Sequence, residues 1–480
     1  MASSQETRDA LMFWALVLIT GFFCVFIGRT VTEFPPLYLM AGMIGLIIGF
    51  VSFLFPKIGL DIVVFSMIFS PKVEGMQISN VGYHSAVIFK LNDFLLGVIL
   101  VAWVARTAVF KGTAFLQRTS LNLPIIAMAT VYVVATLFAI MRGDLLSAAR
   151  PALYVLKYLE YFMLFFMTVN IVQTREDVSR YLKYGLMTAL AVTAFAFTEM
   201  SQGERLNAPF DDPINTKVAI RDNEANTFGG YYLVVFAMLL AGYSQTIGTE
   251  SWICLLSMFF MLTPFLLTQS RSSYIGFMGQ VLFHLFATRK RQLALVFGVG
   301  AGLFLATLVP GIRKTVVDRI LYTFSGQSGE TVVVGGTSIA LEGSAAARVQ
   351  SWRYILTQRF PLHPIVGAGV TGVGMVDVYY PRVIGETGLL GLVCFLWLIQ
   401  RCWRCAWRVF HDAVVDLDRF VGLGALTAIV GLLIHSLGAN TFIIVRIMEP
   451  FWFIMALIAR LYVLEPEPAD RPELAAATAA

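Results

Sequence analysis

Three serines flank one arginine in Gln269-Ser270-Arg271-Ser272-Ser273, a short polar stretch between two long apolar segments. A guanidinium group is always charged, and its planar set of N–H donors can bind two phosphate oxygens at once. The serine hydroxyls can order further phosphate oxygens, or they can simply cap the helix that follows. A charge beside the hydrocarbon core is costly unless it is paired or binds an anion. The spacing therefore predicts an anionic, phosphorylated ligand at Arg271.

The segment 311–385 holds a second group of cations. They are Arg313, Lys314, Arg319, Arg348, Arg353, Arg359 and Arg382. Apolar residues at three- and four-residue spacing predict amphipathic helices over 311–324 and 344–360, both lying on a membrane surface. Lipid phosphates are the alternative partners for these arginines. The Gly/Ser-rich stretch 326–343 between the two helices is predicted to be a mobile lid.

Two further polar motifs lie beside apolar segments. Pro361-Leu-His363-Pro364-Ile-Val-Gly367-Ala-Gly369 predicts a rigid turn where backbone can approach a ligand closely, and Asp377, Arg382, Glu386, Gly388 and Gly391 follow it. Glu386 opens a predicted helix, where the helix dipole favours an acidic side chain, so a structural role is its alternative. Arg221 begins a polar stretch that ends at Asn226, and a solvated loop is the alternative interpretation there.

The composition indicates what must position these residues. Hydrophobic residues make up 58% of the 480-residue chain and charged residues 14%, whereas soluble domains are nearer one quarter charged. We therefore predict an all-α polytopic membrane protein with about 12–14 transmembrane helices. The predicted spans are 10–28, 35–55, a short one at 58–70, 92–110, 123–141, 152–172, 182–200, 229–245, 251–269, 274–288, 292–310, 386–401, 420–440 and 448–464. The net charge of +5 does not suggest nucleic-acid binding.

Short basic clusters predict the orientation of this chain. Arg289-Lys290-Arg291 and the group Arg401, Arg404 and Arg408 are typical of cytoplasmic loops. Both termini are then cytoplasmic, and the segment 311–385 lies on the outer face. We expect one transmembrane domain over 1–464 and a disordered cytoplasmic tail over 465–480. The pair Cys402-Trp-Arg-Cys405 lacks the second pair of a zinc site, so no metal site is predicted.

Taken in order, these motifs resemble those of the O-antigen ligase and O-antigen polymerase superfamily, which are glycosyltransferases of the bacterial inner membrane. The resemblance depends on Ser270-Arg271-Ser272, Arg348 to Trp352, His363-Pro364-Ile-Val-Gly367-Ala-Gly369, Gly385-Glu386-Thr-Gly388-Leu-Leu-Gly391-Leu392, Lys90-Leu-Asn-Asp93 and Glu449-Pro450. Ligases of this superfamily carry His-Asn, then nine residues, then Gly-x-x-Gly. Asp377-Val378 occupies that position here, and this departure favours a polysaccharide polymerase over a ligase.

The resemblance implies a GT-C-like fold and a periplasmic active site in the loop 311–385. It also implies an undecaprenyl-pyrophosphate-linked glycan as donor, with no metal and no cofactor. Arg271 and Arg348 would hold the pyrophosphate with help from Arg221 or Arg382, and Asp377 would be the first candidate for the general base, ahead of Glu386. The partners would be an acceptor glycan, membrane lipid and a chain-length regulator. The polysaccharide, its sugars and its linkage stay open, as does the ligase reaction of lipopolysaccharide synthesis, which transfers the glycan to lipid A core.

A transporter of lipid-linked or anionic sugars is the alternative from another functional class. Transporters place ionisable residues at mid-membrane depth on several helices. The predicted spans hold few of them, namely Asp61, Arg106, Glu160, Glu199, His284 and His435. The clustering of charge near one surface favours an enzyme.

Overall fold

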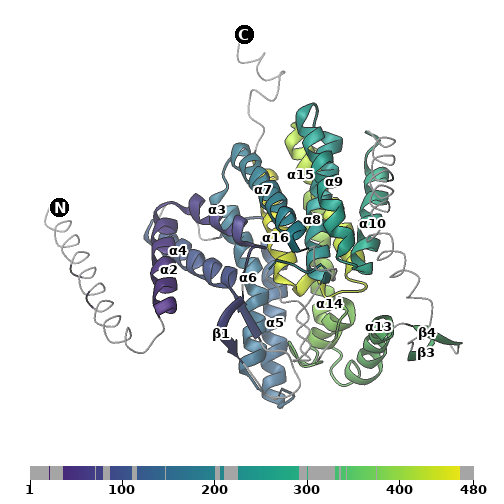
Figure 1. Cartoon of the computed structure of the whole chain (residues 1–480). Helices are drawn as coiled ribbons and strands as arrows, with labels where there is room; N and C mark the ends of the chain where they lie inside the picture. The colour runs from purple at the N-terminus through teal and green to yellow at the C-terminus, as the bar shows by residue number, and fades with distance from the viewer. Residues whose placement is uncertain are drawn as a thin grey trace, which may run out of the picture.

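A computed structural model describes residues 14, 21, 36–70, 72–78, 87–110, 116–145, 147–199, 206–209, 225–290, 300, 330–334, 337–341, 343–374 and 376–464. This part of the chain is a bundle of helices with two small hairpins (Figure 1). Seven of the described helices are long and apolar enough to cross a membrane. The predicted all-α polytopic membrane protein is therefore confirmed. Most of the predicted spans 10–28 and 292–310, and the tail 465–480, lie outside the described residues.

The helices are α2 (Pro36–Leu54), α3 (Pro56–Ser66), α4 (Leu91–Val109), α5 (Asn122–Arg142), α6 (Ala149–Ile171), α7 (Arg175–Glu199), α8 (Ala225–Gln245), α9 (Thr249–Leu267), α10 (Arg271–Ala287), α13 (Gly343–Tyr354), α14 (Tyr379–His411), α15 (Asp416–His435) and α16 (Val445–Leu461). The antiparallel hairpins are β1 (Lys72–Ile78) with β2 (Val87–Lys90), and β3 (Glu330–Val334) with β4 (Thr337–Leu341). Helix α3, at 11 residues, is too short to span a bilayer, as its apolar segment predicts.

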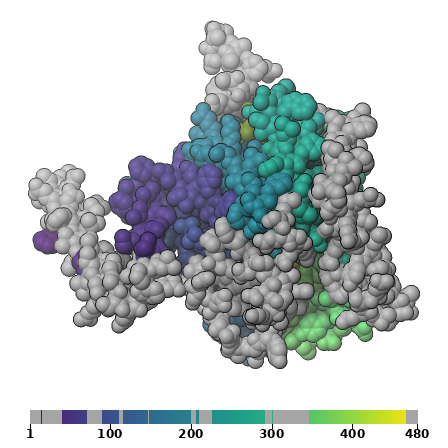
Figure 2. Space-filling model, viewed as in Figure 1, coloured from purple at the N-terminus to yellow at the C-terminus, as the bar shows by residue number. Residues whose placement is uncertain are grey.

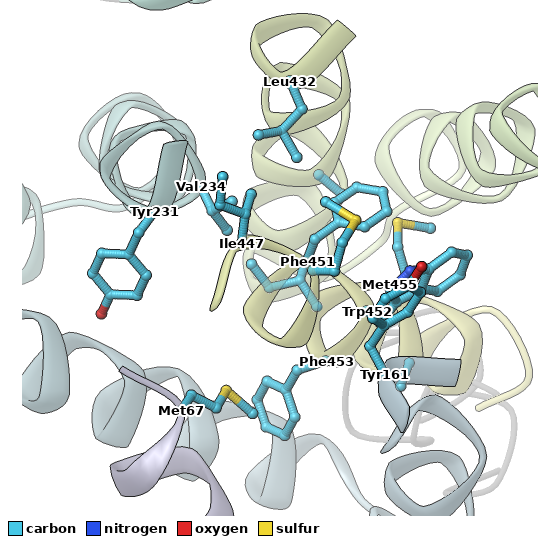
Figure 3. Packing of buried hydrophobic residues seen from close by; sticks show 14 of the residues in the cluster. Met67, Tyr161, Tyr231, Val234, Leu432, Ile447, Phe451, Trp452, Phe453 and Met455 are labelled. Atoms are coloured by element: carbon cyan, nitrogen blue, oxygen red, sulfur yellow. The ribbon is translucent and has the colours of Figure 1, made fainter. Parts of the chain in front are cut away.

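Helix α8 lies at the centre of the bundle, where α9, α10, α15 and α16 pack around it (Figure 1). Of its most apolar 18-residue stretch, 89% is buried within the protein. Beside it, α6 and α16 are joined by edge-to-face aromatic contacts, with Trp452 packing on Phe162 and Phe165 at ring-centroid distances of 5.0 and 5.9 Å. Figure 3 shows Trp452 and Phe451 among the buried side chains of this core. The core therefore fixes the ends of α8 and α16, which carry part of the polar site.

The helix α2 presents apolar side chains outward. Met43, Ile44, Ile47 and Phe50 are each more than half exposed. Together with α4, this helix forms a lobe beside the central bundle (Figures 1 and 2). Such a surface would be unfavourable in water but matches the hydrocarbon of a bilayer.

Three segments differ from their predictions. The span expected at 386–401 begins seven residues earlier, at Tyr379, because α14 continues across a break at Gly388. Residues 330–334 and 337–341 of the predicted lid form the strands β3 and β4, since the β-branched run Thr331 to Val334 favours extended backbone. The predicted helix at 344–360 is present as α13 and a π-helical turn, Ile355–Arg359. Only part of its predicted apolar face is covered, because Ile355 is fully buried but Leu356 is 46% exposed.

Candidate functional site

The polar residues of interest gather at one end of the bundle. We call this the site end; it carries the connections between α5 and α6, α9 and α10, α13 and α14, and α15 and α16. The opposite end carries the connections between α2 and α3, α6 and α7, α8 and α9, and α14 and α15. Side-chain and backbone contacts among the four loops, given below, join the site end into one surface.

The stretch Ser270 to Ser273 is folded by its own hydroxyl groups. Gln269 adopts a φ of 54°, which turns the chain from α9 into α10. Ser270 caps α10 by accepting hydrogen bonds from the Ser273 amide at 3.3 Å and the Ser273 hydroxyl at 2.7 Å. Its own hydroxyl donates to Asn226 Oδ1 at 2.7 Å. The alternative role predicted for these serines, helix capping, is therefore present. Arg271 begins the helix and is half-buried.

Gly438, in the loop between α15 and α16, is the common neighbour of Ser272 and of the predicted site residue Arg348. A Cβ added at Gly438 would lie 2.3 Å from the Ser272 hydroxyl and 3.8 Å from Nε of Arg348. Ser272 comes from α10 and Arg348 from α13, so two distant segments converge on this one glycine. Its missing side chain leaves the space that the arginine and the serine use.

The same loop contacts the residue before Asp377. Asn440 Nδ2 donates to the Val376 backbone carbonyl at 2.6 Å. Asp377 follows, two residues before the start of α14, and its side chain is exposed. Within the described part of the chain it has no hydrogen bond or ion pair. The structure thus brings Arg348 and the residue before Asp377 to one loop, and the Asp377 side chain is exposed beside it.

Arg382 and Glu386 form a buried ion pair one helical turn apart. Arg382 Nε donates to Glu386 Oε1 at 3.0 Å, and the same oxygen accepts the Thr371 amide at 3.0 Å. The Glu386 side chain is only 3% exposed. A carboxylate held by a guanidinium and a backbone amide is committed to structure, so the geometry favours the structural alternative for Glu386. The Arg382 charge is likewise neutralised at short range.

Backbone hydrogen bonds around a break in α14 connect two of the sequence motifs. They join the turn Pro361 to Gly369 with the segment Gly385 to Gly391. Gly388 has a φ of 67°, so the helical ladder is interrupted around it. The Ala368 and Gly369 amides donate to the Gly385 and Glu386 carbonyls, both at 2.9 Å. On the other side of the break, the Leu389 and Leu390 amides donate to the Pro364 and Ile365 carbonyls at 2.9 and 3.1 Å.

This pairing needs glycine at a second position. A Cβ on Gly367 would lie 2.5 Å from the Glu386 carbonyl. The pairing explains why the proline- and glycine-rich turn precedes this helix, and it fixes the direction in which the chain reaches Asp377.

The rim of this unit carries a cluster that sequence reasoning missed. Arg142, at the end of α5, donates to the Gly367 carbonyl at 2.7 Å and pairs with Asp144 at 2.7 Å. His363 Nε2 lies 3.3 Å from the same Asp144 carboxylate. These three side chains are only 28–30% exposed, and their contacts tie the loop to α5.

His435 is a second residue whose place could not be inferred from the sequence. It is fully buried at the end of α15, and its Nδ1 lies 2.8 Å from the Thr441 hydroxyl. Its Nε2 has no hydrogen-bond partner among the described residues. Arg348 is close enough to act on it electrostatically. From the sequence, a lone histidine in an apolar span does not predict that Thr441 and Arg348 lie close to it.

A separate polar network, here the α4–α16 network, lies at the starts of these two helices. It comprises Ser70, Asn92, Asp93, Lys157, Glu160, Arg446 and Glu449. Asn92 Nδ2 donates to the buried Glu449 carboxylate at 3.0 Å, and Lys157 pairs with Asp93 at 2.9 Å. Arg446 donates to the Ser70 carbonyl at 2.8 Å. The motifs Lys90 to Asp93 and Glu449-Pro450 are thus in direct contact, although each is far from the other in sequence.

Of the predicted site residues, Arg271, Arg348, Asp377, Arg382 and Glu386 all lie at the site end, whereas Arg221 lies outside the described residues. In the described part of the chain, no three His, Cys, Asp or Glu side chains are close enough to hold a metal ion. No protein-family model and no curated protein matches this chain. What the arrangement offers chemically is a guanidinium and a serine hydroxyl beside the loop Gly438 to Asn440, and an exposed carboxylate on a segment that contacts the same loop.

Proposed function

We propose that this chain is a glycosyltransferase of the bacterial inner membrane. It transfers a glycan from undecaprenyl pyrophosphate to a sugar hydroxyl at the periplasmic face, as a polysaccharide polymerase. One juxtaposition supports this proposal above the others. Arg348, Ser272 and the residue before Asp377 all adjoin the short loop Gly438 to Asn440. An anion-binding group and a proton acceptor therefore share one surface of a membrane protein.

In the proposed reaction, the acceptor oxygen attacks C1 of the donor sugar while the bond from C1 to the phosphate oxygen breaks. The pyrophosphate departs with the bonding electron pair, and Arg271 and Arg348 stabilise its charge through bidentate hydrogen bonds. Arg221 is a further proposed ligand of the pyrophosphate. The acceptor hydroxyl gives its proton to the Asp377 carboxylate as the new bond forms. Attack opposite the leaving group inverts C1.

Arg382 and Glu386 enter this proposal as positioning residues. Their ion pair holds the Thr371 amide, and the backbone pairing beside Glu386 holds the turn that leads to Asp377. A second base at Glu386 would have to leave a guanidinium and an amide, which makes Asp377 the better candidate.

A transporter is the second candidate, and the α4–α16 network is the observation that favours it. Buried carboxylates and cations inside a bundle are typical of ion and proton pathways. However, Asp93 is the third residue of α4 and Glu449 the fifth of α16, and of the three carboxylates in the network Glu160 alone lies midway along its helix, as the twelfth of 23 residues in α6. A transporter would place ionisable residues at mid-depth on several helices, and we therefore rank the enzyme first.

The deciding experiment uses the purified protein in detergent with an undecaprenyl-pyrophosphate-linked oligosaccharide. A polymerase converts it into longer glycans and releases undecaprenyl pyrophosphate, which thin-layer chromatography and mass spectrometry detect. Addition of lipid A core as acceptor distinguishes a ligase, which would glycosylate it instead. If the donor stays intact in detergent but crosses sealed proteoliposomes, the transporter is correct and the enzyme proposal is wrong.

Orientation has its own test in a variant without the native cysteines. Leu362 at the site end and Val414 at the opposite end are 63% and 47% exposed. We expect Leu362→Cys to react with a membrane-impermeant thiol reagent in intact spheroplasts, and Val414→Cys only after permeabilisation. The reverse pattern would put the site end in the cytoplasm and exclude a periplasmic reaction.

A further inference from the structure

A cavity of about 760 Å³ lies among α7, α8, α9, α15 and α16, away from the Gly438 loop. Its walls are mainly apolar. Met67, Tyr231, Val234 and Phe453, which line one part of it, stand around a common space in Figure 3. No residue proposed for glycosyl transfer lines it. Apolar clefts between transmembrane helices are filled in a membrane, and an aliphatic chain is what the bilayer supplies.

The length of the cavity is set by α8. Its lining residues run from Tyr231 to Ile247, just beyond the end of this helix, which corresponds to about 24 Å at the helical rise per residue. This matches the reach of one extended acyl chain and is too short for an undecaprenyl chain. Ile247, at the α8–α9 connection, is 80% exposed, so the cavity opens at the molecular surface at the opposite end.

Charged side chains line the cavity only toward this opposite end. Lys183 on α7, Glu250 on α9 and Asp416 on α15 are all exposed. Glu250 and Asp416 begin their helices at the opposite end, and Lys183 lies in the half of α7 that is nearer to that end. Asp416 also lies 3.6 Å from Arg419, which offsets part of its charge. One cation facing two carboxylates suits a head group that carries both an amine and a phosphate, since the ammonium donates to carboxylates and Lys183 binds the phosphate. A purely anionic head group would meet two like charges.

We propose that this cavity binds one molecule of a zwitterionic amine phospholipid, of the phosphatidylethanolamine class. One acyl chain lies along α8, and the head group is held by Lys183, Glu250 and Asp416. The lipid fills the space between α7 and the central helix. This inference does not depend on the proposed glycosyl transfer, because the cavity and the site end share no residue.

The first test places a large side chain in the cavity by substituting a residue of its wall. Gly185 of α7 lines it, and a Cβ added there meets no atom within 4 Å, so a side chain can start at this position and Gly185→Phe should occupy part of the cavity. Gly97 of α4 also has nothing within 4 Å but does not line the cavity, which makes Gly97→Phe the matched control. Native mass spectrometry of detergent-purified protein should show one retained lipid in the native chain and in Gly97→Phe. We expect at least about tenfold lower occupancy in Gly185→Phe, because the acyl chain loses its buried methylene contacts.

The second test reverses the charge near the head group. Protein exchanged into vesicles with equal phosphatidylethanolamine and phosphatidylglycerol should retain mainly the amine lipid. Glu250→Lys should shift retention to phosphatidylglycerol, whereas Glu176→Lys, on the first turn of α7 outside the cavity, should not. Equal occupancy in the two glycine variants, or a lipid preference that Glu250→Lys leaves unchanged, would overturn the proposal. Retention of a polyprenyl phosphate in place of phospholipid would overturn it as well.

Discussion

The two ends of the bundle use charged residues in different ways. At the opposite end, carboxylates hold cations from other helices, as in Lys57–Asp177 at 2.7 Å and Arg175–Asp418 at 3.0 Å. At the site end, Asp377 is exposed with no described partner, and one nitrogen of buried His435 has none either. The buried carboxylates Asp177 and Asp418 of the opposite end stabilise tertiary structure. At the site end, the exposed Asp377 carboxylate is left available to a group that is not part of the chain.

The site end also contains an ion pair and backbone hydrogen bonds that stabilise its structure, so the exposed Asp377 does not stand in an unsupported loop. Arg382–Glu386 and the pairing across the Gly388 break hold the first turns of α14 against the loop that leads to the exposed carboxylate. Ordered support around an uncommitted group is what a preorganised site requires. The comparison therefore predicts that substitutions at the site end separate into losses of turnover and losses of stability, depending on the residue.

The largest effect is expected at Asp377. Asp377→Asn should lower glycan transfer by about 10²–10⁴-fold, the usual contribution of a general base, without affecting the fold. Asp377→His should keep part of the activity, since imidazole can also accept the proton. Initial rates of polymer formation by the purified variants, with donor binding measured separately, check this.

Asp412→Asn at the opposite end is the matched control, because Asp412 is also strongly exposed. If Asp377→Asn is nearly active while a folded Glu386→Gln is inactive, the base is Glu386. If both are active, the acceptor is activated by its position beside the bound pyrophosphate alone.

Glu386→Gln tests the supporting part of the site. Removal of one partner from a buried ion pair leaves the Arg382 charge uncompensated, which typically costs about 3–5 kcal/mol. We expect a large fall in the midpoint of thermal unfolding in detergent, with activity reduced in proportion to the folded fraction. Arg382→Met with Glu386→Gln should recover part of the stability, since neither charge is then buried alone. A single variant as stable as the native chain would contradict the structural role.

The arginine variants come next. Arg271→Ala and Arg348→Ala should each reduce polymer formation at least tens-fold, because a charge-assisted hydrogen bond contributes about 2–3 kcal/mol. Arg271→Lys should also be poor, since an ammonium cannot supply the planar pair of donors. Arg408→Ala is the control; Arg408 donates to the Tyr462 hydroxyl at the opposite end. Normal polymer yield from both site-end alanine variants would mean that these arginines contact lipid.

An interaction could be predicted from the sequence when its partners are only a few residues apart in the chain. The Ser270 cap depends on residues three apart, and α13 depends on a periodic pattern, so both were accessible. The Arg382–Glu386 pair was accessible in principle, because opposite charges four residues apart on a helix face each other. The contact between Asn92 and Glu449 spans 357 positions, and the pairing across Gly388 depends on a backbone break that no residue pattern specifies. Tertiary packing alone decides such contacts.

The smallest effect is expected at the opposite end, at Asp177. Burial raises the pKa of this carboxyl, but hydrogen bonds from Lys57 and the Gln173 amide, with nearby positive charge, outweigh it and hold the pKa below its ordinary value. Stability from this group is therefore present above the unfolded pKa of about 3.9 and is lost as the pH falls through the lower folded value. Asp177→Asn should cost on the order of 1 kcal/mol at pH 7, because Lys57 is half exposed. Unfolding midpoints of the native and variant proteins should converge as the pH falls below about 4, while glycan transfer at pH 7 stays unchanged. A difference between the two unfolding midpoints that widens in acid would contradict the stabilising role of Asp177. A loss of glycan transfer without a loss of fold would mean that this residue of the opposite end also contributes to the reaction.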